Sequence, residues 1–259
     1  MSQLTINCQA LLKAYETGKL GQTKMPEDSN PSDFASQEMR LAYFTLPMAL
    51  NYQRDSYKLW EAALKTFDDP EACDVFDIKK AAEMPPEILR QKLLEHKLAL
   101  QPNKHIQTWQ TICRTLDENW GVTGFRIKSG MTQGSGPLGN LLKATDSDFL
   151  KLKEIIQKEF KKGFPYLSGP KIFNYWSFII QEYGGAKLNN SEFIEIAPDT
   201  HITKCSVKLG VITVQEASNI SREEIAARWR ELLKSSGINP IDMHPPLWFW
   251  SRNGFKHDL

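Results

Sequence analysis

The most informative stretch of this chain is residues 161–210, KKGFPYLSGPKIFNYWSFIIQEYGGAKLNNSEFIEIAPDTHITKCSVKLG. Two lysines lead into a turn that contains proline and glycine, and Lys171 then opens an apolar helix. A turn that feeds a helix N-terminus presents backbone N–H groups and the positive end of the helix dipole, which together favour a phosphate. A lysine in such a place suits a nucleophilic amine. A solvent-exposed lysine is the alternative that this pattern leaves open.

The helix that follows Lys171 is expected to bury one face. The apolar positions at helical spacing are Ile172, Phe173, Trp176, Ile179, Ile180 and Tyr183. A different face carries Lys171, Asn174, Tyr175 and Phe178, at i, i+3, i+4 and i+7. Further along, Asp199 stands in the run Pro198–His201, where we expect it to be the N-cap of a new helix.

Outward from this stretch, hydrophobic periodicity is helical almost throughout. It predicts helices over 3–17, 34–47, 54–67, 85–99, 103–118, 146–162, 171–183, 200–209 and 221–236. Only Val122–Lys128 and Val207–Val214 alternate as strands do, and residues 18–33 and 129–145 have the composition of loops. The predicted fold class is mostly α, with few or no short strands.

The amino-acid composition excludes several classes of protein. The 259 residues carry 32 Lys and Arg against 31 Asp and Glu, which excludes a histone-like or acidic-tail protein. Residues 101–259 hold 20 basic and 16 acidic side chains, an excess that suits phosphate binding but also a solvated helix face. The four cysteines are scattered, and no window is apolar enough for a membrane helix. We therefore expect a soluble intracellular protein with no membrane partner.

Two weaker motifs are rejected at this stage. Gly134–Gly139 matches G-x-G-x-x-G, but Pro137 interrupts it and no strand–helix alternation surrounds it, so a flexible connection is expected. His201 and Cys205 lie four residues apart, yet no second pair of ligands accompanies them. We expect neither a cofactor nor a metal.

Gly169-Pro170-Lys171 and Pro198-Asp199-Thr200-His201 together give the chain a resemblance to a known family. They resemble the hairpin and the following acidic segment of the helix–hairpin–helix (HhH-GPD) DNA glycosylase superfamily. The spacing of 28 residues between Lys171 and Asp199, and the lack of cysteines for an iron–sulfur cluster, are nearest to the cluster-less 8-oxoguanine glycosylase/AP lyase type. The resemblance implies one unit of two helical lobes over residues 1–259, with the motif and catalytic segment at about 161–210.

The resemblance also implies a reaction and its residues. The expected activity is that of a DNA N-glycosylase with AP lyase activity, which flips out a damaged or modified base and attacks the sugar C1′. Lys171 would be the nucleophile and Asp199 the stabilising carboxylate. The implied DNA-binding residues are Leu167, Ser168, Gly169, Lys161, Lys162, His201 and Lys204; the implied base-pocket residues are Asn51 and Gln53 on a helical stretch around 51–54, with Tyr175, Trp248 and Trp250. For the C-terminal aromatic residues, core packing is the competing interpretation.

The expected partner is double-stranded DNA that contains a damaged or modified base, bound by a monomer in the cytoplasm or nucleoid, or in the nucleus of a eukaryote. Two other functions stay open: a non-catalytic helix–hairpin–helix DNA-binding module, and a nucleoside hydrolase on the same fold. Within the glycosylase class, the enzyme could excise a hypermodified base from foreign DNA as a defence. Lys171 could also be a phosphate contact in a monofunctional enzyme.

Overall fold

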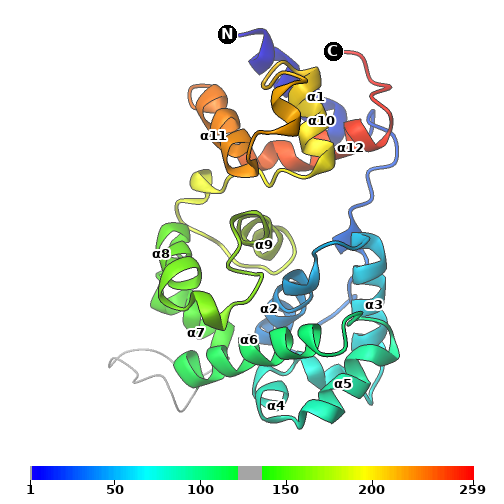
Figure 1. The fold of residues 1–259 in the computed structure, drawn as a ribbon, viewed down its shortest axis with the longest axis vertical. Coiled ribbons are helices and arrows are strands. Elements are labelled where there is room, and N and C mark those ends of the chain that lie inside the picture. Colours follow the sequence, from blue (N-terminus) through cyan, green and yellow to red (C-terminus); the bar gives the residue numbers. More distant parts are fainter. Residues whose placement is uncertain (1, 122–135) are drawn as a thin grey trace. The chain divides into compact units, whose positions relative to one another are not determined.

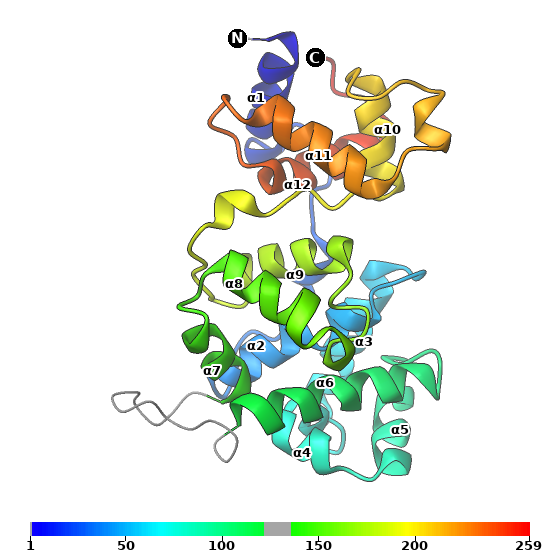
Figure 2. The ribbon, with the colours of Figure 1, turned by 60° about the vertical axis from the view of Figure 1, so that its left-hand side comes forward.

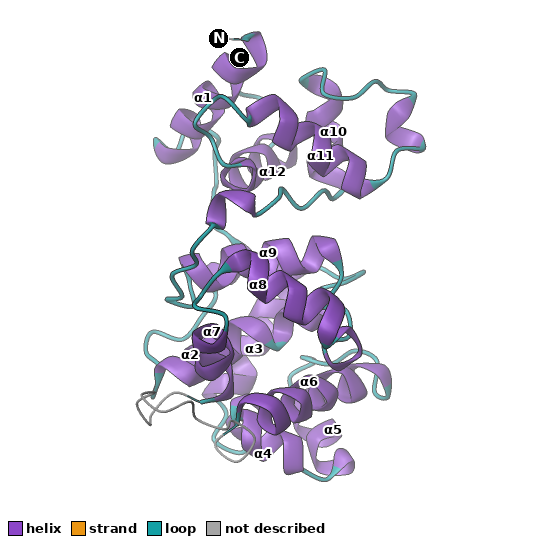
Figure 3. Ribbon diagram, turned by 90° about the vertical axis from the view of Figure 1, so that its left-hand side faces the viewer, coloured by secondary structure: helices purple, strands orange, loops and turns teal. Residues whose placement is uncertain are grey.

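The computed structural model describes residues 2–121 and 136–259 and divides the chain into two compact units. One unit comprises residues 26–189, and the other combines residues 1–25 with 190–259. Both are helical, and Figure 3 shows helices joined by loops throughout the described residues. Within those residues, β pairing is limited to an isolated bridge between Asp148 and Asn189. The mostly α fold class is confirmed.

The unit of residues 26–189 is built around α6 and α9 (Figure 1). Its α-helices are α2 (Gln37–Thr45), α3 (Ser56–Asp68), α4 (Ile78–Glu83), α5 (Pro86–Glu95), α6 (Lys104–Trp120), α7 (Pro137–Ala144), α8 (Phe149–Glu154) and α9 (Pro170–Glu182). Helix α6 packs against α4, α5 and α7, and α9 packs against α2 (Figure 2). The core between them is aromatic, because Tyr43, Phe44, Trp60, Phe76 and Trp109 are all buried.

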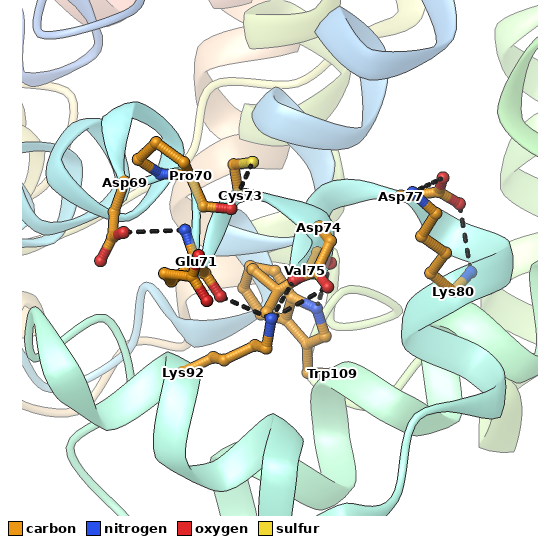
Figure 4. Close-up of polar contacts among 10 residues, drawn as sticks. All are labelled: Asp69, Pro70, Glu71, Cys73, Asp74, Val75, Asp77, Lys80, Lys92 and Trp109. Carbon is orange, nitrogen blue, oxygen red and sulfur yellow. Dashed lines mark hydrogen bonds and ion pairs between the residues drawn. The ribbon is translucent and has the colours of Figure 1, made fainter.

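Polar contacts hold the segment between α3 and α4 against α5 and α6 (Figure 4). The ammonium group of Lys92 lies 2.8 Å from the Asp74 carboxylate, and the indole N–H of Trp109 donates to the carbonyl of Val75 at 3.0 Å. Asp77 then caps α4 by accepting the backbone N–H of Lys80 at 3.1 Å. A short irregular segment is thereby fixed on both sides.

Helix α7 is fixed by groups far away in the sequence. Both oxygens of the Glu38 carboxylate accept backbone N–H groups at the N-terminus of α7, from Leu138 at 2.8 Å and Gly139 at 2.9 Å. The side-chain amide of Asn140 donates to the carbonyl of Trp120 at 2.8 Å, at the end of α6. The Glu38 carboxylate therefore occupies the N-terminus of α7, where the motif Gly134–Gly139 ends.

The second unit contains both chain termini and four α-helices among its described residues (Figure 1). They are α1 (Gln3–Glu16), α10 (Thr200–Lys208), α11 (Arg222–Leu233) and α12 (His244–Arg252). Helix α12 packs against α1 and α10, and Trp229 of α11 donates its indole N–H to the Ser206 hydroxyl of α10 at 2.8 Å. Leu11, Trp229, Leu247 and Phe249 form its buried centre.

The nine predicted helices are all present, with ends that differ by a few residues; over 146–162 the α-helix ends at Glu154 and a π turn follows. Three helices were missed: α4, α7 and α12. The loop expected over 129–145 is wrong for residues 137–144, where Pro137 starts a helix; residues 129–135 lie outside the described residues. No described helix combines the length and apolar character needed to cross a membrane.

The predicted strand Val207–Val214 is wrong, and so is the helical stretch at 51–54. Helix α10 extends to Lys208, and Gly210 closes it with a φ of +73°, so the alternating apolar residues lie on a helix end and a turn. Residues 51–54 form a non-helical bend before α3. The other predicted strand, Val122–Lys128, lies outside the described residues.

Candidate functional site

The turn before α9 is closed by its own backbone. The N–H groups of Leu167, Ser168 and Gly169 donate to the carbonyls of Pro165, Phe164 and Tyr166, at 2.8, 2.9 and 3.0 Å. The Leu167 side chain is fully buried, and Ser168 donates its hydroxyl to the carbonyl of Lys161. The amides expected to hold a phosphate therefore have partners within the turn, and DNA contact by these three residues stays a prediction.

Lys171 is the second residue of α9 and is half-buried. Behind it, Phe173, Trp176, Ile179 and Ile180 are buried as expected, whereas Ile172 and Tyr183 of the same predicted face are only half-buried. The opposite face is less open than predicted, because Asn174 and Phe178 are buried too. The Asn174 side-chain amide donates to the carbonyl of Pro170 at 2.8 Å, which ties the first turn of the helix to itself.

The turn meets the bend at 51–54 through two stacked tyrosines. The rings of Tyr52 and Tyr166 lie parallel, with centroids 4.0 Å apart and planes 9° from each other. The Lys104 ammonium lies 5.5 Å from the Tyr52 ring and 5.0 Å from the Tyr166 ring, and it lowers the pKa of Tyr166. Sequence reasoning missed all three residues, although it placed the turn and the 51–54 segment in one site.

Tyr166 of this stack and Gln53, which follows Tyr52, have left-handed backbone. Tyr166 has a φ of +62° and Gln53 a φ of +51°. Residues with side chains adopt this conformation at a cost, and such positions occur preferentially at functional sites. Gln53 is exposed, whereas Asn51 is half-buried and accepts a hydrogen bond from the Ser56 hydroxyl at 3.0 Å. Of the two predicted base-pocket residues on this bend, Gln53 is the one that reaches solvent.

Tyr175 leads to a buried carboxyl group that sequence reasoning missed. Its hydroxyl donates to Oε1 of Glu27 at 3.2 Å, and the indole N–H of Trp60 donates to the same oxygen at 2.9 Å. Glu27 is fully buried, and its Oε2 has no hydrogen-bond partner within the described residues. Burial raises the pKa of this carboxyl to about 7, against which the hydrogen bonds act more weakly. Nothing in the charge pattern of the sequence distinguishes this glutamate from its exposed neighbour Asp28.

Asp199 belongs to the other unit and has the predicted capping role. Its Oδ1 accepts the backbone N–H of Ile202 at 2.9 Å at the start of α10. The second oxygen, Oδ2, has no hydrogen-bond partner in the part of the chain that the structure describes, and the residue is half-buried. The carboxylate is thus oriented through one oxygen while the other is available.

A polar and aromatic chain of contacts lies beside Asp199. Nδ1 of His201 is 3.0 Å from the Ser251 hydroxyl, and its ring meets Trp248 edge-on at 5.5 Å. The Arg252 guanidinium lies 4.9 Å from the centroid of the Trp248 ring. Desolvation lowers the pKa of His201, which therefore favours the neutral imidazole. His201 and Trp248 are both half-buried. His201 lies two residues after Asp199 on α10, and Trp248 lies on α12, which packs against α10.

The remaining predicted residues divide clearly. Trp250 is 2% exposed and donates its indole N–H to the carbonyl of His257 at 2.8 Å, which favours the packing interpretation over a base-pocket role. Lys161, Lys162 and Lys204 are exposed. Cys205 is buried and donates to the carbonyl of Leu247, and burial raises the pKa of its thiol to about 12, so it is a neutral core residue.

The candidate site residues therefore come from both units. Lys161, Lys162, Lys171, Tyr175 and the Tyr52–Tyr166 stack belong to residues 26–189, whereas Asp199, His201, Lys204 and Trp248 belong to the other unit. In comparisons with known proteins, no family model matches the chain and no curated protein is significantly similar to it.

Glu27 gives a prediction about stability and pH. Because its pKa is raised to about 7 in the folded state, the folded protein binds more protons than the unfolded chain between about pH 4.5 and pH 7. This group should therefore lower the free energy of unfolding as pH rises through that window, by about 3 kcal/mol in total. Glu27→Gln should remove this dependence, and urea unfolding at several pH values measures it.

The matched control is Glu87→Gln, which changes an exposed glutamate at the start of α5. This variant keeps Glu27, so it should retain the wild-type dependence of stability on pH. If Glu27→Gln differs from the wild type by a constant amount from pH 5 to pH 8, Glu27 does not titrate in this window.

Proposed function

We propose that this protein is a DNA glycosylase with AP lyase activity that excises a damaged or modified base from double-stranded DNA. The observation that carries the proposal is the geometry of Asp199. A carboxylate held by a helix N-terminus through Oδ1, with Oδ2 available, is a preorganised negative charge. Cleavage of a glycosidic bond develops positive charge on the sugar, and such a carboxylate stabilises it.

Lys171 supplies the covalent step in this proposal. Lys171 lies in the first turn of α9, directly after a loop that is closed by backbone hydrogen bonds. The backbone from which its side chain extends is therefore fixed. The neutral amine attacks the sugar C1′ as the base departs with the electrons of the glycosidic bond. Loss of a proton and opening of the sugar ring give a Schiff base, and β-elimination then breaks the C–O bond to the 3′ phosphate.

The base has to leave the duplex before this chemistry. Tyr175 and the exposed Gln53 are the base-pocket residues proposed for residues 26–189. Trp248 of the other unit is half-buried, and its contact with a base stays a prediction. Tyr175 is held by Glu27, so its ring has a fixed orientation. Lys161, Lys162 and Lys204 would contact phosphates, which position the strand without reading its sequence.

The first test is Lys171→Gln. This change should abolish borohydride trapping on DNA that contains an abasic site, because no amine is left to form the Schiff base, while DNA binding stays within about twofold. Base release is scored in parallel on a panel of duplexes that each carry one lesion or modification. Base release that survives in Lys171→Gln would show a monofunctional enzyme in which Lys171 contacts phosphate.

The second test is Asp199→Asn, with Asp77→Asn as its control. Asparagine caps a helix about as well as aspartate, so both variants should fold, and each loses one negative charge at a helix N-cap. We expect Asp199→Asn to lower the rate of base release by more than about 100-fold and Asp77→Asn to leave it unchanged. Full activity in Asp199→Asn would contradict the glycosylase assignment itself.

Substrate form separates the glycosylase from its alternatives. A DNA-binding module would bind the duplexes and release no base, and a nucleoside hydrolase would act on free nucleosides. For the strand contacts, reversing the charge of Lys161 and Lys162 should weaken duplex binding and lower the slope of affinity against salt concentration. Fluorescence anisotropy at several salt concentrations measures both quantities; an unchanged slope would mean that these lysines do not contact the DNA.

A further inference from the structure

The unit that combines residues 1–25 with 190–259 contains a pocket of about 720 Å³. Its two walls are the segment Lys19–Gln22 that follows α1 and the chain from Trp250 to His257 at the end of α12. The volume is in the range of small-molecule sites and far exceeds a single ion. Of the residues discussed so far, Trp250, Arg252 and His257 line this pocket, and Arg252 also contacts the Trp248 ring.

The walls are joined by specific contacts. The side-chain amide of Asn253 donates to the carbonyls of Leu20 and Gln22, which fixes the first wall to the end of α12. Gly21 has a φ of +88°, and a Cβ atom there would lie 3.1 Å from the Asn253 amide nitrogen. A larger residue at position 21 would therefore strain the backbone and press on this link.

The second wall is folded back on itself. Trp250 donates its indole N–H to the carbonyl of His257 at 2.8 Å and meets the Phe255 ring edge-on at 4.8 Å. The Lys208 ammonium of α10 lies 5.2 Å from the Phe255 ring centroid and 5.9 Å from the Trp250 ring centroid. It therefore contacts both aromatic side chains of this wall. The pocket is thus part of the packed unit, although the chain that forms it lies near both termini.

The charged side chains that line the pocket are all positive. Lys19, Arg252 and Lys256 contribute cations and His257 a further nitrogen donor, and the residues that line the pocket include no carboxylate. Asp258 follows directly but is not part of the lining. A concave site with several cations and no anion concentrates positive potential and attracts phosphate groups. A guanidinium group also binds two phosphate oxygens at once, and ammonium groups add point charges.

We propose that this pocket binds a phosphate-bearing unit of nucleotide size, either a free nucleoside monophosphate or one phosphodiester unit of a nucleic-acid strand. The shared chemistry is a phosphate held by Lys19, Arg252 and Lys256. Exposed backbone at Gly21 and Gly254 allows close approach, since neither residue has a side chain in the way. The inference does not depend on the chemistry proposed for Lys171 and Asp199, and it is tested by binding and not by base release.

The experiment compares the full chain with a Lys19→Glu/Lys256→Glu variant, using three probes at low salt: inorganic phosphate, thymidine 5′-monophosphate and a fluorescent ten-residue oligothymidylate. The control is Lys13→Glu/Lys234→Glu, which makes the same change in net charge on exposed lysines of the same unit outside the pocket. We expect the pocket variant to weaken nucleotide or oligonucleotide binding about tenfold or more and the control to change it less than threefold.

The probes separate the two sources of the phosphate. If the protein binds the monophosphate, and the pocket variant but not the control weakens that binding, the pocket is a site for free nucleotides. If the protein binds the oligonucleotide but not the monophosphate, and the pocket variant weakens that binding, the pocket is a site for a nucleic-acid strand. Absence of binding for all probes, or an equal effect of the control, overturns the proposal. If the double reversal lowers the melting temperature, Lys19→Gln/Lys256→Gln provides the same comparison with less perturbation, and unweakened binding there also overturns it.

Discussion

The clamp that α2 places on α9 is the constraint on which half of the candidate site depends. The side-chain amide of Gln37 donates to the carbonyl of Gly184 at 2.6 Å, and the Arg40 guanidinium donates to the carbonyl of Tyr183 at 2.5 Å. Near the middle of α9, Trp176 donates its indole N–H to the Thr45 hydroxyl at 2.9 Å. Helix ends leave carbonyls without partners, and here a neighbouring helix supplies the donors. Because α9 is held along its length, Lys171 and Tyr175 start from a fixed backbone.

That clamp also explains why α9 is buried on more than one face. A helix that packs only on one side would leave Asn174 and Phe178 in solvent, as its spacing suggested. Instead both are buried, and Asn174 satisfies its amide within the first turn. Residues close to Lys171 therefore have little freedom to rearrange. In the proposed reaction, Lys171 and Asp199 must be oriented toward the sugar. Because the backbone of each is already fixed, less free energy is needed to reach that orientation.

Sequence reasoning was most reliable where the information is local. Spacing located the nine helices, and the capping pattern located Asp199, because a helix period and an N-cap are properties of neighbouring residues. It missed α12 because two prolines follow His244, and these are tolerated only because they occupy the first turn. It missed α4 because six residues are too few to show a period.

The parts of the candidate site that could not be predicted come from distant contacts. The Tyr52–Tyr166 stack requires left-handed backbone at Tyr166 and, beside Tyr52, at Gln53, and neither residue type signals it. Glu27 is recognisable only once Trp60 and Tyr175 are seen to surround it. For Trp250 the sequence left core packing and a base-pocket role open, and its burial and its hydrogen bond to the His257 carbonyl favour packing.

The carboxylate of Glu38 has a consequence for how freely the sequence can change. It joins position 38 to the start of α7 across 100 residues, while Asn140 joins α7 to the end of α6. Side chains of α2 and α7 therefore fix where α7 begins. A change at position 38 would leave the backbone N–H groups of Leu138 and Gly139 without these acceptors, so the sequences of α2 and α7 constrain each other during evolution.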